Sequence, residues 1–215
     1  NLPLPSLGQV GWLLLCMVGA RTFAMGMNRY LDRDIDLRND RTRNRALPAG
    51  RLSPRACLAW SAAAACMLMF GAFQLGTLPG WLSLPLLVVL ASYSLMKRLS
   101  WTTHWYLGAC LGFAPIAVAI AITGTVPPAV LALGVAVTLW TAGFDILYAL
   151  QDLTVDRHAG LHSVPARYGA STALIISRAC FVGMVVCLFA AGLFAQLRSL
   201  YFVGVGCVVL VLLYE

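Results

Sequence analysis

The sequence predicts an all-α integral membrane protein, built as a bundle of transmembrane helices without a separate soluble domain. Hydrophobic residues make up 60% of the chain and charged residues only 11%, against roughly 25% charged residues in soluble proteins. Long apolar runs such as 107–122 and 130–150 approach the roughly 20 residues that cross a bilayer as a helix. The lipid bilayer is therefore the first partner that the composition predicts.

Seven spans follow one another along the chain, separated by Gly, Pro and charged residues. They are expected at 8–31, 55–76, 81–96, 103–123, 128–150, 170–196 and 199 to the end. Gly and Pro mark the short uncharged turns at 78–80 and 124–128. The chain opens without Met or a basic leader and closes inside an apolar run. We therefore expect a single transmembrane domain, 1–215, that is truncated at both ends.

The distribution of the positive charges predicts the orientation in the membrane. The net charge is +7, and eight Arg fall within 29–55, with further basic groups at 97–98 and at 157–178. The turns on the other side carry no charge, and only Arg198 breaks this alternation. Such a bias places the basic loops in the cytoplasm. We expect the cell (inner) membrane of a bacterium, an active site facing the cytoplasm, and no nucleic-acid partner.

All seven aspartates lie in two clusters where apolar spans end. The first cluster comprises Asp32, Asp34, Asp36 and Asp40, and the second Asp145, Asp152 and Asp156. Four predicted spans separate the clusters, and an even number returns the chain to the same side of the membrane. The pair at 32 and 36 recurs 120 residues later at 152 and 156, which hints at an internal duplication. Two helices would then present matching carboxylate pairs across one cavity.

The spacing within each cluster predicts a stripe of ligands on one helix face. Asn28, Asp32 and Asp36 are four residues apart, so each step drifts by only about 40° around the helix. Arg21 lies seven residues earlier on the same face, and Tyr148 joins the second cluster at a step of three from Asp145. For Asp34 and Asp40 we favour simple pairing with nearby Arg at a helix end.

Paired carboxylates at these positions are best explained by a bound cation. Like charges four residues apart repel on a helix, and each charge near bilayer depth costs about 2.5–3.5 kcal/mol. Ligands that offer only oxygen suit Mg²⁺, which completes its shell with water and substrate phosphates. Arg side chains bind phosphate oxygens through bidentate hydrogen bonds. Together these groups predict a diphosphate head group at the membrane face, with its hydrocarbon tail between the helices.

Four motifs resemble the UbiA-type intramembrane prenyltransferases. The first is NRYLDRDID, which is similar to their NxxxDxxxD signature. The second and third are RTRNRALPAGRLS (41–53) and SYSLMKRLSWTTHWYLG (92–108). The fourth is DILYALQDLTVDRHAGLHSVPARYG (145–169), which is similar to the second signature of the family. The motifs occur in family order over nearly the whole chain.

The resemblance implies a nine-helix bundle, of which about seven helices fall in this chain, and Mg²⁺-dependent transfer from a polyprenyl diphosphate to an aromatic acceptor. The implied ligands of one Mg²⁺ are Asn28, Asp32 and Asp36, and those of another are Asp152 and Asp156. The implied groups for the diphosphate or the acceptor carboxylate are Arg21, Arg45, Lys97 and Arg98. Asp145 and Tyr148 would line the cavity and bind substrate.

Within the family, the second signature is most similar to the 4-hydroxybenzoate branch, which serves ubiquinone synthesis. His104 stands where many members of that branch have Gln, and GLHSVPARYG replaces a Lys-Ser version of that segment. These variants are more similar to relatives that serve menaquinone synthesis through the futalosine route. A dihydroxynaphthoate is therefore the alternative acceptor, and both acceptors carry a hydroxyl and a carboxylate.

Other chemistries fit the pattern less well. His104, His158 and His162 do not have the spacing of metal ligands on one helix, which argues against a metal site made of these residues. His104 is expected instead to make a hydrogen bond at a helix start. A secondary transporter would carry ionisable groups near the midplane, often in inverted repeats. A CDP-alcohol phosphotransferase would carry one compact Asp-Gly-rich motif. Here the acids lie at helix ends on one predicted side.

Overall fold

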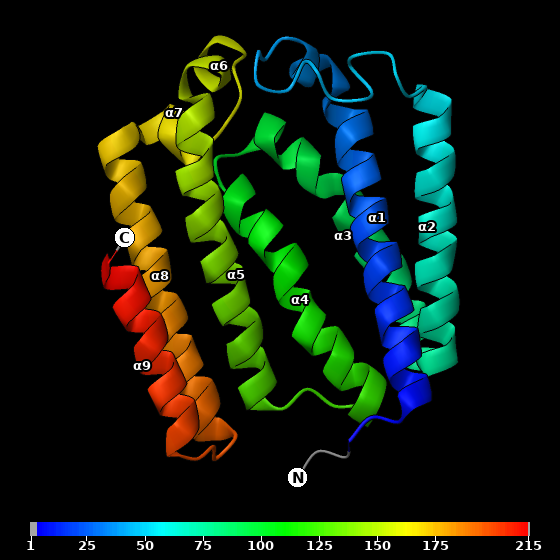
Figure 1. Ribbon diagram of the computed structural model, residues 1–215, viewed down its shortest axis with the longest axis vertical. Coiled ribbons are helices and arrows are strands. Elements are labelled where there is room, and N and C mark those ends of the chain that lie inside the picture. Colours follow the sequence, from blue (N-terminus) through cyan, green and yellow to red (C-terminus); the bar gives the residue numbers. More distant parts are fainter. Residues whose placement is uncertain (1–3, 215) are drawn as a thin grey trace. The chain divides into compact units, whose positions relative to one another are not determined.

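The computed structural model describes residues 4–214, and that part of the chain is helical without any β-strand (Figure 1). The long helices are α1 (Leu7–Leu37), α2 (Pro54–Leu75), α3 (Thr77–Leu99), α4 (Thr103–Thr123), α5 (Pro128–Ala149), α8 (Ala170–Phe194) and α9 (Ser199–Tyr214). Short elements between α5 and α8 are η1 (Leu150–Asp152), α6 (Leu153–His158) and α7 (Val164–Tyr168).

Six helices within residues 4–214 are long and apolar enough to cross a membrane, when α5, η1 and α6 count as one span, Pro128–His158. The apolar helix α9 is shorter. Each of the seven predicted spans corresponds to one long helix, which confirms the predicted all-α membrane protein. The sequence did not predict α6 and α7, because five or six residues are too few to display a helical period.

Side chains outside α1 fix both of its ends. Ser6 accepts a hydrogen bond from the Gln9 backbone N–H, and the Gln9 side chain accepts one from the Ser6 N–H, which forms a capping box. At the other end α1 continues to Leu37, whereas the predicted span ends at 31. The Thr42 hydroxyl donates to the Asp36 carbonyl at 3.0 Å, so a carbonyl of the last turn finds a partner.

The chain forms two compact units. The first runs to Arg98 and includes Ile120–Gly124, and the second holds Leu99–Ala119 and the chain from Thr125 onward. In the first unit α1 packs along α2 (Figure 1). A methyl group added at Gly19 would lie 2.8 Å from the Leu68 backbone nitrogen and 2.9 Å from the Ala64 carbonyl oxygen. Such close approach through a small residue is typical of packing between membrane helices.

In the second unit α5 packs along α8 (Figure 1). The Ser177 hydroxyl, fully buried, donates to the Gly143 carbonyl at 2.8 Å, so a polar bond joins the two apolar helices. Ile146, Val164 and Ala173 form a buried cluster against which Trp101 and Trp105 pack. This cluster joins α5, α7 and α8 around the second acidic cluster.

We predict that Gly19→Ala destabilises the first unit, because its methyl group has no space against the α2 backbone. Overpacking of this kind costs about 1–3 kcal/mol, so the midpoint of thermal unfolding in detergent should fall. Gly11→Ala, also on α1, is the matched control, because a methyl group there meets nothing within 4 Å. Equal midpoints for the two variants would contradict the packing described here.

Candidate active site

Asn28 and Asp32, one turn apart on α1, form the inner part of the first acidic cluster. The Asn28 amide group donates to Asp32 Oδ2 at 2.7 Å and to the Ser94 hydroxyl of α3 at 3.0 Å. Because the NH₂ group of Asn28 donates both of these hydrogen bonds, its amide carbonyl oxygen is the atom that can coordinate a cation. The structure therefore brings together two of the three ligands predicted for this stripe.

Asp36, at the end of α1, is buried with only 5% of its surface exposed. Both of its carboxylate oxygens accept from Arg45 Nη1, at 2.7 and 2.9 Å, and Arg29 Nη1 lies 3.8 Å from Oδ2. A buried carboxylate requires such compensation. The two guanidinium groups supply the positive charge that compensates this carboxylate.

The predicted stripe therefore divides between two sets of partners. Asn28 faces Ser94 on α3, whereas Asp36 faces the segment that follows α1. The cause is the drift of about 40° at each step of four residues, which accumulates over two steps. Asp34 and Asp40 are exposed and pair with Arg33 and Arg43, at 3.8 and 3.0 Å, as expected for ordinary helix-end charges.

Lys97 and Arg98 lie in the last turn of α3. Arg98 donates to the Leu31 carbonyl at 2.5 Å, and its Nη2 lies 3.8 Å from Asp32 Oδ1. The end of α3 thus places positive charge beside the first acidic cluster. This is the arrangement that an anionic head group next to carboxylates requires.

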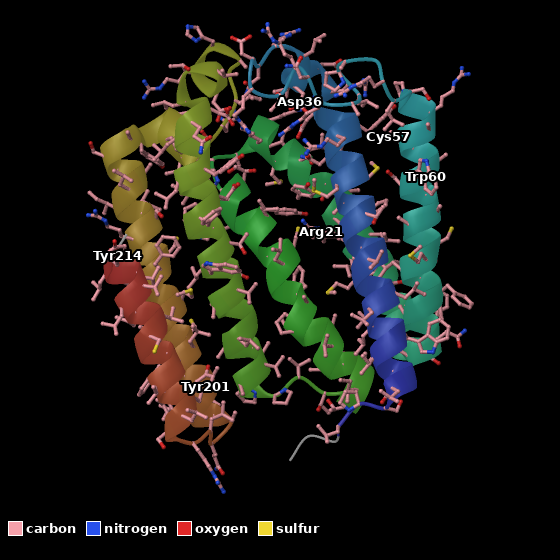
Figure 2. The ribbon with its side chains drawn as sticks, in the orientation of Figure 1. Arg21, Asp36, Cys57, Trp60, Tyr201 and Tyr214 are labelled. Atoms are coloured by element: carbon pink, nitrogen blue, oxygen red, sulfur yellow. The ribbon has the colours of Figure 1, made fainter. Side chains whose placement is uncertain are left out.

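A cavity of about 570 Å³ lies beside α1 within the first unit. Its charged lining comprises Arg21, Arg29 and Arg45, and its apolar lining includes Met25, Leu47, Leu52 and Trp60. Figure 2 shows Arg21 part way along α1, Asp36 at the end of this helix, and Trp60 on α2. Volumes of about 300–1,000 Å³ are typical of small-molecule sites.

Two residues of this cavity, Arg29 and Trp60, are not among those predicted from the sequence. Arg29 lies eight residues after Arg21, and this helical spacing was the signal that could have identified it. Trp60 lies on α2 and carried no such signal, because only the folded chain brings it to this wall.

The second acidic cluster lies in the second unit, where the chain passes from α5 through η1 into α6. Asp152 and Asp156 are buried, with 7% and 1% exposed. Asp145 and Tyr148, on the last turns of α5, keep 33% and 47% of their surfaces exposed. The buried acidic side chains therefore lie at the end of this span, and partly exposed polar side chains lie one to two turns earlier.

His104, at the start of α4, connects this region to two other segments. Its Nδ1 lies 2.6 Å from Asp145 Oδ2, and its Nε2 accepts from the Val164 backbone N–H at 3.1 Å. The sequence predicts a hydrogen bond of His104 near a helix start, and the structure identifies its two partners. His158 instead contacts the Thr154 carbonyl at 2.8 Å through Nδ1.

The donor chemistry of both clusters suits Mg²⁺. Among residues 4–214, no group of three or more His, Cys, Asp and Glu side chains is placed to hold a metal ion by itself. Mg²⁺ requires no such cage, since one or two carboxylates together with water and substrate phosphates are its usual ligands. Asp32 with the Asn28 amide oxygen, and Asp152 with Asp156, offer donors of that type.

The chain matches the UbiA prenyltransferase family over residues 2–215. It is 32% identical over 206 residues to the 4-hydroxybenzoate solanesyltransferase of Synechocystis sp., a match that covers 95% of this chain and 68% of the relative. Further curated relatives are named 4-hydroxybenzoate geranyltransferase and octaprenyltransferase. The chain spans between 54% and 71% of the length of such relatives.

Two solved structures share the fold. A UbiA homologue from Aeropyrum pernix, in its apo state, is 32% identical with a TM-score of 0.92, over 99% of this chain and 80% of that chain. A UbiA homologue from Archaeoglobus fulgidus, bound to GPP and Mg²⁺, is 22% identical with a TM-score of 0.77, over 97% and 75%. The motifs, the helical fold and these matches agree, and the chain belongs to the UbiA prenyltransferase family.

Proposed function

We propose that this protein transfers a polyprenyl group from its diphosphate to an aromatic hydroxy acid, such as 4-hydroxybenzoate, in quinone synthesis. The observation that carries the proposal is the pair of carboxylates at the end of each of two membrane helices, Asp32 with Asp36 and Asp152 with Asp156. Residues 1–215 would form a single transmembrane prenyltransferase domain. The basic residues that flank both clusters support a site on the cytoplasmic side of a bacterial cell membrane.

The proposed cofactor is Mg²⁺, with Asn28, Asp32 and Asp36 holding one ion and Asp152 and Asp156 another. The oxygen-only donor sets support this assignment. The fold shared with the GPP- and Mg²⁺-bound Archaeoglobus homologue supports it further. When bound, Mg²⁺ neutralises charge on the departing diphosphate. Arg45 Nη1 lies 2.7 Å from Asp36 Oδ1, so this guanidinium group would be available beside the metal ligand for phosphate oxygens.

The remaining chemistry rests on positioning and on the exclusion of water. Lys97 and Arg98 would hold the diphosphate beside Asp32. The allylic C–O bond breaks, its electron pair leaves with the diphosphate, and a ring carbon of the acceptor forms the new C–C bond. That carbon then loses its proton, either to the departing diphosphate or to an aspartate. The apolar walls of the bundle keep water from the reactive allylic group.

The cavity beside α1 supports an aromatic acid as the acceptor. Arg21 would pair with the acceptor carboxylate, and Trp60 and Met25 would contact its ring. The curated relatives share 4-hydroxybenzoate in their names but differ in the prenyl group, from geranyl to solanesyl. His104 and the segment 160–169 favour dihydroxynaphthoate as a second acceptor, for which the chemistry would be the same.

We predict that membranes containing the full-length protein form a prenylated product from a polyprenyl diphosphate and one of the two acceptors. The assay offers 4-hydroxybenzoate and 1,4-dihydroxy-6-naphthoate separately and detects the product by mass spectrometry. EDTA should abolish the product because the carboxylates cannot hold a diphosphate without the metal. Absence of product from both acceptors, with the protein inserted, would count against this function.

Within the same assay, Asp32→Ala and Asp152→Ala should each abolish transfer while membrane insertion persists, because each removes a metal ligand. Asp34→Ala is the matched control. Its side chain is 71% exposed and pairs only loosely with Arg33, so we expect activity near that of the parent. Activity retained in both test variants would eliminate the two-metal arrangement.

Arg21→Gln should raise the KM for the acceptor at least about tenfold, since a charge-assisted hydrogen bond contributes about 1.5–3 kcal/mol. The KM for the prenyl diphosphate should change little. Steady-state kinetics with each substrate varied in turn measures both values. Arg55→Gln, at the exposed start of α2, is the control. An unchanged acceptor KM in Arg21→Gln would place the acceptor elsewhere.

A further inference from the structure

His104 is a buried polar side chain that three segments of the second unit share. Only 2% of its surface is exposed. The residue lies on the first turn of α4, its Nδ1 contacts Asp145 of α5 at 2.6 Å, and its Nε2 contacts the backbone of Val164 at the start of α7 at 3.1 Å. Both ring nitrogens are therefore engaged with fixed partners.

These two partners determine the tautomer of the ring. A backbone N–H can only donate, so Nε2 of His104 must present its lone pair to Val164. The single proton of the neutral imidazole is then on Nδ1, where it is donated to the Asp145 carboxylate. His104 therefore acts as a fixed donor toward Asp145.

The surroundings keep this geometry rigid. Val164 is fully buried and belongs to the same apolar cluster as Ile146, the neighbour of Asp145. The Ser163 hydroxyl accepts from the Ala166 N–H at 3.2 Å, which caps α7 next to Val164. The imidazole thus bridges two segments whose apolar side chains pack against each other.

Asp145, unlike its partner, is one third exposed, so its carboxylate can meet a substrate. It lies seven residues before Asp152, on the last turns of α5, whereas Asp152 lies in η1. Under the proposed function, Asp145 is therefore the carboxylate of this unit that would meet the acceptor hydroxyl.

We propose that His104 is a positioning residue, whose Nδ1–H holds Asp145 so that the carboxylate accepts a hydrogen bond from the acceptor hydroxyl. This inference rests on the proposed prenyl transfer. A hydroxyl that donates to a carboxylate gains electron density on its oxygen, and this makes the ring carbon next to it a better nucleophile. His104 itself has only 2% of its surface exposed, so it acts through Asp145.

The first test compares His104→Gln with His104→Leu in the full-length protein. A glutamine side chain can donate to Asp145 through its NH₂ group and accept from Val164 through its carbonyl oxygen, whereas leucine can do neither. The Leu variant should lose about 100-fold in kcat, and the Gln variant should stay within about tenfold of the parent, as expected for misplacement of a reacting group. His162→Leu, at an exposed position of the same loop, should behave as the parent.

The second test measures the tautomer directly and does not depend on activity. Protein labelled with ¹⁵N-histidine gives ring nitrogen shifts by NMR, and the His104 signals are those that disappear in His104→Gln. We expect a neutral ring with its proton on Nδ1. A proton on Nε2, a doubly protonated ring, or equal losses in the Gln and Leu variants would overturn the positioning role. An Nδ1–H ring in a parent protein without transferase activity would refute the proposed function and leave the described contacts intact.

Discussion

The compensation of carboxylates inside apolar helices is the constraint on which the candidate site depends. Asp36 is buried at the end of α1, and Arg45 bonds both of its oxygens while Arg29 lies near. An uncompensated charge in such a position would cost several kcal/mol. This requirement fixes the segment after α1 against the helix, and it also brings two guanidinium groups to the wall of the cavity. The same guanidinium groups thus compensate a buried carboxylate and line the cavity.

The second unit satisfies the constraint differently. Asp145 pairs with a neutral imidazole donor, and His104 in turn is held by the Val164 backbone. No such arrangement can be built within a single helix, because the three groups come from α4, α5 and α7. The apolar cluster of Ile146, Val164 and Ala173 supplies the rigidity. The position of the Asp145 side chain therefore depends on residues that are distant in sequence.

Much of the fold could be predicted because run length and hydropathy specify membrane helices almost directly. The end of α1 could not, since polarity marks the edge of the membrane, whereas the helix continues until Thr42 caps it. Spacing alone predicted that Asn28, Asp32 and Asp36 share a stripe. It could not predict that the stripe divides between Ser94 and Arg45, or that His104 meets Asp145, because tertiary contacts decide both. The two acidic pairs that lie 120 residues apart also differ in local structure. Asp32 and Asp36 lie in one continuous helix, whereas Asp152 lies in η1 and Asp156 in α6.

The most direct test of the account is the number of divalent ions that the acidic clusters bind. Mn²⁺ favours the same carboxylate ligands as Mg²⁺, and electron paramagnetic resonance can count it in purified full-length protein with a non-ionisable prenyl diphosphate analogue. The account predicts two bound ions in the parent protein, one in Asp32→Ala, one in Asp152→Ala and two in Asp34→Ala. Two ions retained in both test variants, or an equal loss in Asp34→Ala, would contradict the assignment of one cation to each cluster.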